Sequence, residues 1–117
     1  MKSSCPKKKC SEKHLDRLWS SAVRNIADGR CQYCGGIGYH AHHLVNRWHK
    51  STRWHVANGV YVCAYCHNLM HKYPELSERY FVGKHGQGAW DELRELSNTV
   101  FRGNTDEIET NLSRFQR

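Results

Sequence analysis

Two Cys-x-x-Cys pairs, Cys31–Cys34 and Cys63–Cys66, divide this 117-residue chain and limit the ways in which it can fold. The six cysteines could form disulfides, but the N-terminus has no apolar segment of the kind that directs export. Close cysteine pairs in a chain with nine histidines are instead typical of a metal site inside the cell. Thiolates favour Zn²⁺, and four of them complete a tetrahedral shell. The pattern therefore predicts one structural zinc ion bound by Cys31, Cys34, Cys63 and Cys66.

The second cysteine pair runs directly into a segment with two histidines, His67 and His71. They are four residues apart, so on a helix both imidazoles lie on one face. Upstream, residues 39–45 alternate as a short strand does, which places His42 on one face and His43 on the other. Imidazoles accept several divalent ions, so the pattern suggests a second metal site beside the first.

The chain is strongly basic, with a formal net charge of +7 and a pI near 9.3. A polyanionic partner, most simply nucleic acid, suits this charge, although many small proteins are basic without one. Residues 1–11 are expected to form a flexible basic arm, and residues 46–57 a loop in which cations alternate with tryptophans. Trp48 and Trp54 either meet nucleic acid there or cover the core. The cations assigned to phosphate contact are Lys7, Lys8, Lys9, Arg47, Lys50 and Arg53.

Helical periodicity flanks the cysteine and histidine region on both sides. Residues 12–27 are expected to form a helix, capped by Ser11, whose apolar face packs on the metal-binding core. Residues 75–101 favour two covering helices that are interrupted by a glycine-rich turn at 83–88, with apolar positions that include Leu96 and Val100. Residues 102–117 are expected to be a tail or a short helix.

The central region is expected to contain a second strand at residues 60–62 and a helix at about 65–72 that carries the paired histidines. Asn58-Gly59 is an ordinary signal for a type I′ hairpin turn, so Asn58 serves this turn, the chemistry, or both. The mean hydropathy of −0.82 and the lack of an apolar run near ~20 residues predict no membrane span and a cytoplasmic location. The length predicts a single domain that gains stability from a metal staple.

The order of these groups resembles the HNH endonuclease family. Cys31-x-x-Cys34 is followed by His42-His43, by Asn58 and then by Cys63-x-x-Cys66-His67-x-x-x-His71, over roughly residues 28–72. The segment 74–95 is similar to small phage HNH proteins, and a phage origin rests on that similarity alone. The resemblance implies an α+β fold with a zinc-stapled, treble-clef-like ββα-metal core at 28–72. It also implies a nuclease domain spanning residues 12–101, with the preceding helix and the covering helices at 75–101.

The resemblance implies a role for each residue of the histidine region. His43 matches the general base, and Asn58 matches the central asparagine that orients it. His42 and His67 match the ligands of a catalytic divalent ion, which would be Mg²⁺, Mn²⁺, Ni²⁺ or Zn²⁺. His71 matches a ligand that many relatives lack, so a surface role stays open. Many relatives have Asp where this chain has His42, and the loss of that charge favours the softer ions.

The activity implied by the resemblance is metal-dependent hydrolysis of DNA to 5′-phosphate and 3′-hydroxyl ends, by a monomer or a homodimer. The first alternative is a zinc-stabilised DNA-binding module without catalysis, which has no need for three histidines together. The second is a protein-interaction module on a zinc scaffold. DNA binding separates the second alternative from the other two, and cleavage separates the first alternative from the enzyme.

Overall fold

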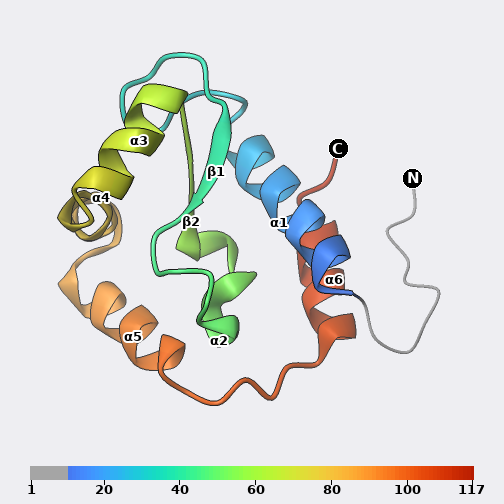
Figure 1. The fold of residues 1–117 in the computed structure, drawn as a ribbon. Coiled ribbons are helices and arrows are strands. Elements are labelled where there is room, and N and C mark those ends of the chain that lie inside the picture. Colours follow the sequence, from blue (N-terminus) through green and yellow to red (C-terminus); the bar gives the residue numbers. More distant parts are fainter. Residues whose placement is uncertain (1–10) are drawn as a thin grey trace.

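The computed structural model describes residues 11–117, which form an α+β fold with helices around a two-stranded sheet (Figure 1). Residues 1–10 of the expected basic arm, with Lys7, Lys8 and Lys9, lie outside the described residues. Among the helices of the described part, none combines the length and apolar character needed to cross a bilayer. The elements are α1 (Glu12–Ile26), β1 (His40–His43), α2 (Lys50–Arg53), a 3₁₀ turn (Val56–Asn58), β2 (Gly59–Val62), α3 (Ala64–Lys72), α4 (Glu75–His85), α5 (Gln87–Ser97) and α6 (Thr105–Ser113).

The expected N-terminal helix is confirmed as α1. It begins where the Ser11 side chain accepts a hydrogen bond of 3.1 Å from the backbone N–H of His14. It ends before Asp28 and Gly29, which both have positive φ angles. The apolar face packs against the sheet and against α6, and its buried residues are Leu15, Leu18, Trp19, Ala22 and Val23.

The sheet separates two hydrophobic clusters. β1 and β2 are antiparallel, with His42 opposite Val60 and His43 opposite Gly59. Val60 and Val62 face the cluster built with α3, α4 and α5, whereas Tyr61 faces the cluster built with α1 and α6. Because its two faces meet different cores, β2 is buried on both sides. β1 is shorter than the expected strand at 39–45.

The connection between the strands differs from the sequence prediction. The expected loop at residues 46–57 contains the short helix α2 and a 3₁₀ turn. The hairpin turn expected at Asn58-Gly59 is wrong, because Asn58 ends the 3₁₀ turn and Gly59 begins β2 with φ −120°. Glycine is required there for space, since a Cβ would lie 2.4 Å from Val23 Cγ2 and 2.8 Å from Trp19 Cζ2.

The covering helices α4 and α5 are confirmed, and they break at Gly86, whose φ is +93°. Phe81 of α4 and Trp90 of α5 pack with ring centroids 5.4 Å apart. The predicted apolar stripe extends too far, because α5 ends at Ser97 and Val100 is exposed beyond it.

The C-terminal segment forms the helix α6, which lies beside α1 (Figure 1). Asn104 caps it by accepting hydrogen bonds from the backbone N–H groups of Asp106 and Glu107, at 3.0 and 3.1 Å. Leu112 is buried against α1, and Asn25 Nδ2 donates to the carbonyl of Phe115 at 2.8 Å. The two ends of the described chain therefore share one core.

Candidate metal centres and the histidine cleft

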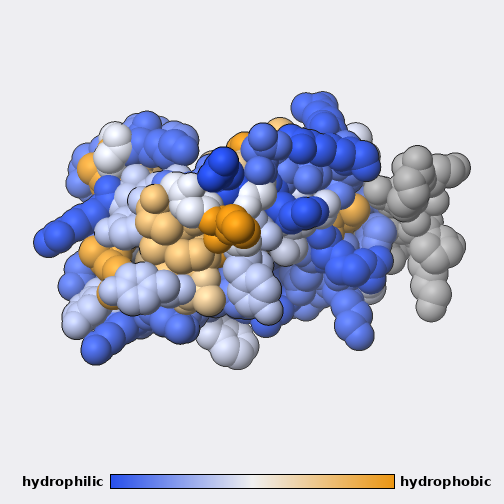
Figure 2. All heavy atoms as spheres, turned by 90° about the horizontal axis from the view of Figure 1, so that it is seen from above, coloured by the Kyte–Doolittle hydropathy of each residue, from blue (hydrophilic) through white to orange (hydrophobic). Residues whose placement is uncertain are grey.

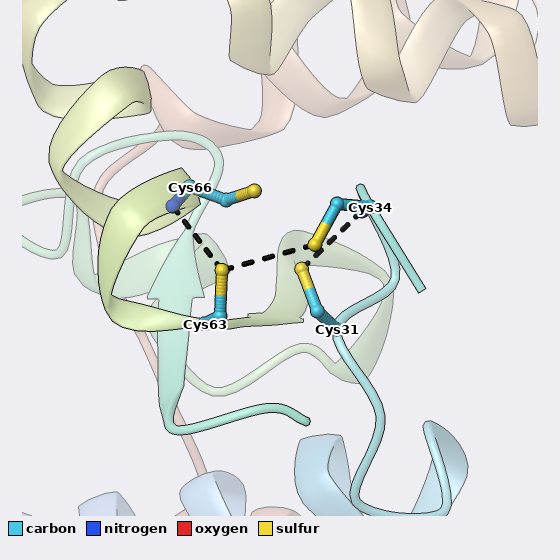
Figure 3. Close-up of side chains that lie close together, drawn as sticks. All are labelled: Cys31, Cys34, Cys63 and Cys66. Carbon is cyan, nitrogen blue, oxygen red and sulfur yellow. Dashed lines mark hydrogen bonds between the residues drawn. The ribbon is translucent and has the colours of Figure 1, made fainter. Parts of the chain in front are cut away.

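The cysteine pairs come from the turn after α1 and from the start of α3, which meet at one end of the molecule (Figure 1), and the four side chains lie close together (Figure 3). Cys31 and Cys34 lie in the turn after α1, while Cys63 and Cys66 lie at the start of α3. All four sulfur atoms lie within 4.8 Å of one another. Cys34 Sγ and Cys63 Sγ are 3.8 Å apart, which equals the edge of about 3.8 Å in a tetrahedron with Zn–S bonds of ~2.3 Å. The four cysteines can therefore bind a metal ion such as zinc.

Backbone N–H groups donate hydrogen bonds to the first sulfur of each cysteine pair. Cys31 Sγ accepts from the backbone N–H of Cys34, and Cys63 Sγ from that of Cys66, each at 3.4 Å. Burial tends to raise the pKa of the Cys31 thiol, but N–H groups that include that of Cys34 outweigh it and lower the pKa to about 6. Burial and the neighbouring thiols raise the pKa of Cys66. The cluster thus favours a thiolate even before a cation binds.

The cysteine cluster lies at the molecular surface. Cys31 and Cys66 are buried, whereas Cys34 is exposed. This end of the molecule, seen from above, shows an apolar area between hydrophilic flanks (Figure 2). Large apolar side chains exposed in the flanking turn and in α3 include Ile37 and Tyr65.

Three histidines form a second group of potential ligands. His42 on β1 faces His67 and His71 on α3, and one ring nitrogen of each lies within 4.8 Å of the others. The Nε2 atoms of His67 and His71 are 3.0 Å apart, as expected for helix positions four residues apart. Burial, reinforced by the other two histidines, lowers the pKa of His42 to about 3. Burial also lowers the pKa of His67. His42 and His67 are therefore mostly neutral near pH 7, the form in which imidazole binds a metal ion.

A serine that the sequence did not single out supports this group. Ser77 of α4 is buried, and its Oγ shares a hydrogen bond of 3.3 Å with His42 Nε2. A serine within an amphipathic helix carries no signal of such a role. His40 lies on the same face of β1, with its ring centroid 4.5 Å from that of His67, although it is outside the three-histidine group.

His43 occupies the opposite face of β1, as the alternation of the strand predicts. Its ring stacks on Trp19 of α1 with centroids 3.8 Å apart and planes 5° from parallel. Its Nε2 lies 3.0 Å from the backbone carbonyl of Arg53. Because a carbonyl only accepts, Nε2 carries the proton of the neutral ring and Nδ1 carries the lone pair. Burial lowers the pKa of His43 to about 4, although the Arg53 carbonyl and Asp16 oppose this shift.

Asn58 holds the connection between the strands from inside the core. It is fully buried, and its Oδ1 accepts from the backbone N–H of Val45 at 2.7 Å. Its Nδ2 donates to the carbonyls of Val45 at 3.0 Å and Thr52 at 3.2 Å. Thr52 immediately precedes Arg53, whose carbonyl holds His43. Asn58 is therefore linked to His43 through the backbone of Thr52 and Arg53.

Within the described residues, the cations expected to contact phosphate are paired with carboxylates of α1. Arg53 is buried, with Nε and one terminal nitrogen on Asp16 at 3.1 and 2.7 Å. Lys50 pairs with Glu12 at 2.6 Å, and Arg47 pairs with Asp16 at 3.2 Å. The burial of Arg53 fits a structural role better than the expected phosphate contact, whereas Arg47 and Lys50 keep exposed side chains.

Asp16 lines the cleft, but the sequence gave no sign of its role. A single acidic residue among the polar positions of a helix is ordinary. The Asp16 carboxylate also accepts from Trp54 Nε1 at 2.9 Å. Burial tends to raise the pKa of Asp16, but the hydrogen bonds from Arg53 and Trp54 outweigh it and lower the pKa. Asp16 thus fastens α1 to the connection that holds His43.

A single cleft of about 730 Å³ joins these groups. Of the two tryptophans, Trp54 covers the core and is only 4% exposed, whereas Trp48 is 85% exposed at this cleft and does not cover the core. Side chains from both faces of β1 line this cleft, so His43 and the three potential ligands lie around the same cavity. The side chains around it include Asp16, Trp19, His42, His43, Arg47, Trp48, His67, His71 and Ser77.

The site thus combines four cysteines at one end of the molecule with four histidines around a cleft. Lys50 and Asn58 are outside the residues that line this cleft. Comparisons of the chain with protein-family models, with curated proteins and with solved structures give no match.

Proposed function

We propose that this protein is a metal-dependent nuclease of the HNH type that hydrolyses phosphodiester bonds in DNA. One observation supports the proposal most. His43, fixed in one tautomer by the Arg53 carbonyl, lines the same cleft as three histidines grouped as metal ligands. A general base and a metal-ligand group within one cleft are the two components that hydrolysis of a phosphodiester requires.

His43 would act as the general base through Nδ1. Its pKa of about 4 in the free protein keeps the ring neutral near pH 7, and a bound phosphate anion would raise that pKa. Nδ1 takes a proton from water as the water oxygen forms a bond to phosphorus. The bond from phosphorus to the 3′ oxygen breaks, and that oxygen gains a proton from solvent. The products carry a 5′-phosphate and a 3′-hydroxyl.

His42, His67 and His71 are the residues that would hold the divalent ion. When bound, such an ion stabilises negative charge on the phosphate and on the leaving oxygen. Three imidazole ligands would leave coordination positions open, as catalytic sites require and four-cysteine sites do not. Their nitrogen donors suit Zn²⁺, Ni²⁺ or Mn²⁺ better than Mg²⁺. The cysteine cluster would then hold zinc in a structural role.

Nicking of supercoiled plasmid tests the proposal. The wild type and His43→Ala are compared with EDTA, Mg²⁺, Mn²⁺, Ni²⁺ or Zn²⁺ in separate reactions. We expect metal-dependent nicking by the wild type and a loss on the order of 10²–10⁴-fold in the variant, the usual contribution of a general base. His85→Ala is the matched control, since His85 ends α4 and lies outside the residues that line the cleft.

Circular dichroism and zinc content must be unchanged in both variants for the comparison to count. An absence of nicking with every metal, alongside intact DNA binding, would refute catalysis and favour a zinc-stabilised DNA-binding module. An absence of both nicking and DNA binding would favour a protein-interaction module instead.

A further inference from the structure

Trp48 is an outlier among the tryptophans of the chain. It is 85% exposed, whereas Trp19, Trp54 and Trp90 are between 3 and 5% exposed in the cores. An indole ring is mostly apolar, and its burial usually stabilises the folded protein. The exposed ring of Trp48 makes little of this contribution. Trp48 lies on the rim of the histidine cleft, so its exposure coincides with the proposed site of reaction.

The backbone beneath Trp48 is held in place. Its N–H donates to Asn46 Oδ1 at 2.9 Å, which closes a tight turn. Val45, the residue before this turn, is bound on both its N–H and its carbonyl by the buried Asn58 side chain. The indole is therefore presented to solvent from an anchored turn, which limits the entropy lost when a ligand covers it.

The neighbouring residue supplies a positive charge for the same ligand. Arg47 also lines the cleft, and 57% of its side chain is exposed while it pairs with Asp16. A guanidinium beside an aromatic face suits a nucleotide. The guanidinium can bind the phosphate while the ring stacks on the base of the same or the adjacent nucleotide. The faces of paired bases are covered by their neighbours in the duplex, so an indole can cover only a base that is out of the stack.

We propose that Trp48 stacks on an unpaired base, so that the cleft prefers DNA with single-stranded nucleotides beside the phosphodiester to be cut. Single strands, flaps and forks share this feature, and a fully paired duplex lacks it. The inference rests on the proposed function, because it names the substrate class of the same cleft. The inference concerns DNA binding, however, so it is tested without DNA cleavage.

The test measures the Kd of the protein for a fluorescent single strand and for the matching blunt duplex, in EDTA after the zinc content has been verified. Base stacking on an aromatic side chain predicts that Trp48→Ala weakens single-strand binding about 5- to 150-fold. Duplex binding should change less than about 2-fold. Trp48→Phe keeps an aromatic face and should recover most of the lost affinity.

Acrylamide quenching of tryptophan emission gives a second readout of the same contact. Because the other three indoles are buried, Trp48 should account for most quenching in the free protein, and the single strand should protect it while the duplex does not. Ile37→Ala is the matched control, since Ile37 is also 85% exposed but lies outside the residues that line the cleft.

Each outcome is decisive for Trp48. Unchanged single-strand affinity in Trp48→Ala, equal losses on both DNAs, or an equal loss in Ile37→Ala would overturn the inference. Those results would leave the proposed nuclease standing, because plasmid nicking by the wild type tests it separately. A wild type that binds neither DNA would overturn both the inference and the proposed function.

Discussion

Replacement of Gly59 by alanine probes the contact that ties α1 to the sheet and to His43. The backbone of Gly59 has φ −120° and ψ 147°, a β conformation that alanine adopts without strain. In the absence of other contacts, the change would stabilise the fold by about 0.4–1 kcal/mol, because alanine restricts the unfolded chain more than glycine does. Any net destabilisation must therefore come from packing.

The packing cost follows from two distances. The new methyl carbon would lie 2.4 Å from Val23 Cγ2 and 2.8 Å from Trp19 Cζ2, whereas carbon atoms in contact prefer about 3.5–4.0 Å. Both neighbours are buried in the same cluster, so α1 must move away from the sheet by about 1 Å. Overpacking of this kind costs about 1–3 kcal/mol. We expect a net loss of about 1–2 kcal/mol in the free energy of unfolding.

The same movement would disturb His43, because Trp19 stacks on its ring at 3.8 Å. A displacement of about 1 Å in a catalytic group reduces rates by up to about 10²-fold. We therefore expect Gly59→Ala to slow plasmid nicking on the order of 10- to 100-fold. The three grouped histidines face the other core, so any affinity they have for a metal ion should change much less.

Urea denaturation followed by circular dichroism measures the stability change. Gly83→Ala is the matched control, because it adds the same methyl group inside α4 where nothing lies within 4 Å. Alanine in a helix interior should stabilise that variant by about 0.5–1 kcal/mol. A Gly59→Ala protein as stable as the wild type, with full nicking activity, would refute the packing argument.

Three further predictions concern other contacts. Removal of zinc from the four-cysteine site should unfold residues 30–72. Structural zinc contributes on the order of 10–16 kcal/mol to folding, whereas the net stability of a domain is typically ~5–15 kcal/mol. Unchanged circular dichroism after verified zinc removal would contradict this. Asp16→Asn should destabilise the fold by about 2–3 kcal/mol in urea at pH 7, since it leaves the buried Arg53 with a weaker partner. The folded-state pKa of Asp16 is lowered, so this contribution is present above pH ~4 and lost as pH falls below it, and a wild-type advantage that grows on acidification would count against the ion pair. Ser77→Ala should weaken the affinity of the histidine group for Zn²⁺ or Ni²⁺ by about 10-fold in calorimetry, because it removes the hydrogen bond to His42, and an unchanged affinity would exclude that role.

Sequence reasoning predicted features that depend on local spacing. Ser11 marks the start of α1, and the alternation of β1 places His42 and His43 on opposite faces because side chains in a strand point alternately to either side. The spacing within each Cys-x-x-Cys pair likewise places its two sulfurs close together, whereas the meeting of the two pairs was predicted from the preference of four thiolates for zinc. These features follow from neighbours along the chain, where the geometry is nearly fixed.

Other features depend on residues that are distant in the sequence, and the chain gave little sign of them. Asp16 pairs with cations more than thirty residues away, and Ser77 reaches His42 from a different helix. Gly59 looked like half of a hairpin turn because Asn-Gly has that local preference. The close approach of Trp19 decides its role instead, and such an approach appears only when α1 packs on the sheet.

The register of β1 on β2 is weakly specified by the histidine-rich sequence of β1, His40-Ala41-His42-His43. A slip of one residue turns every side chain to the opposite face. After such a slip a histidine would still face α3 and another would still face α1, so polarity hardly distinguishes the two alignments. Shape does, because the indole of Trp19 fits flat against the sheet only where His43 lies opposite a residue without a side chain. Gly59 thus favours the observed alignment of the two strands. If a side chain at this position allowed the slip, NMR spectra would show a second set of histidine ring signals, from molecules in which His42 and His43 have exchanged faces while the four cysteines stay together.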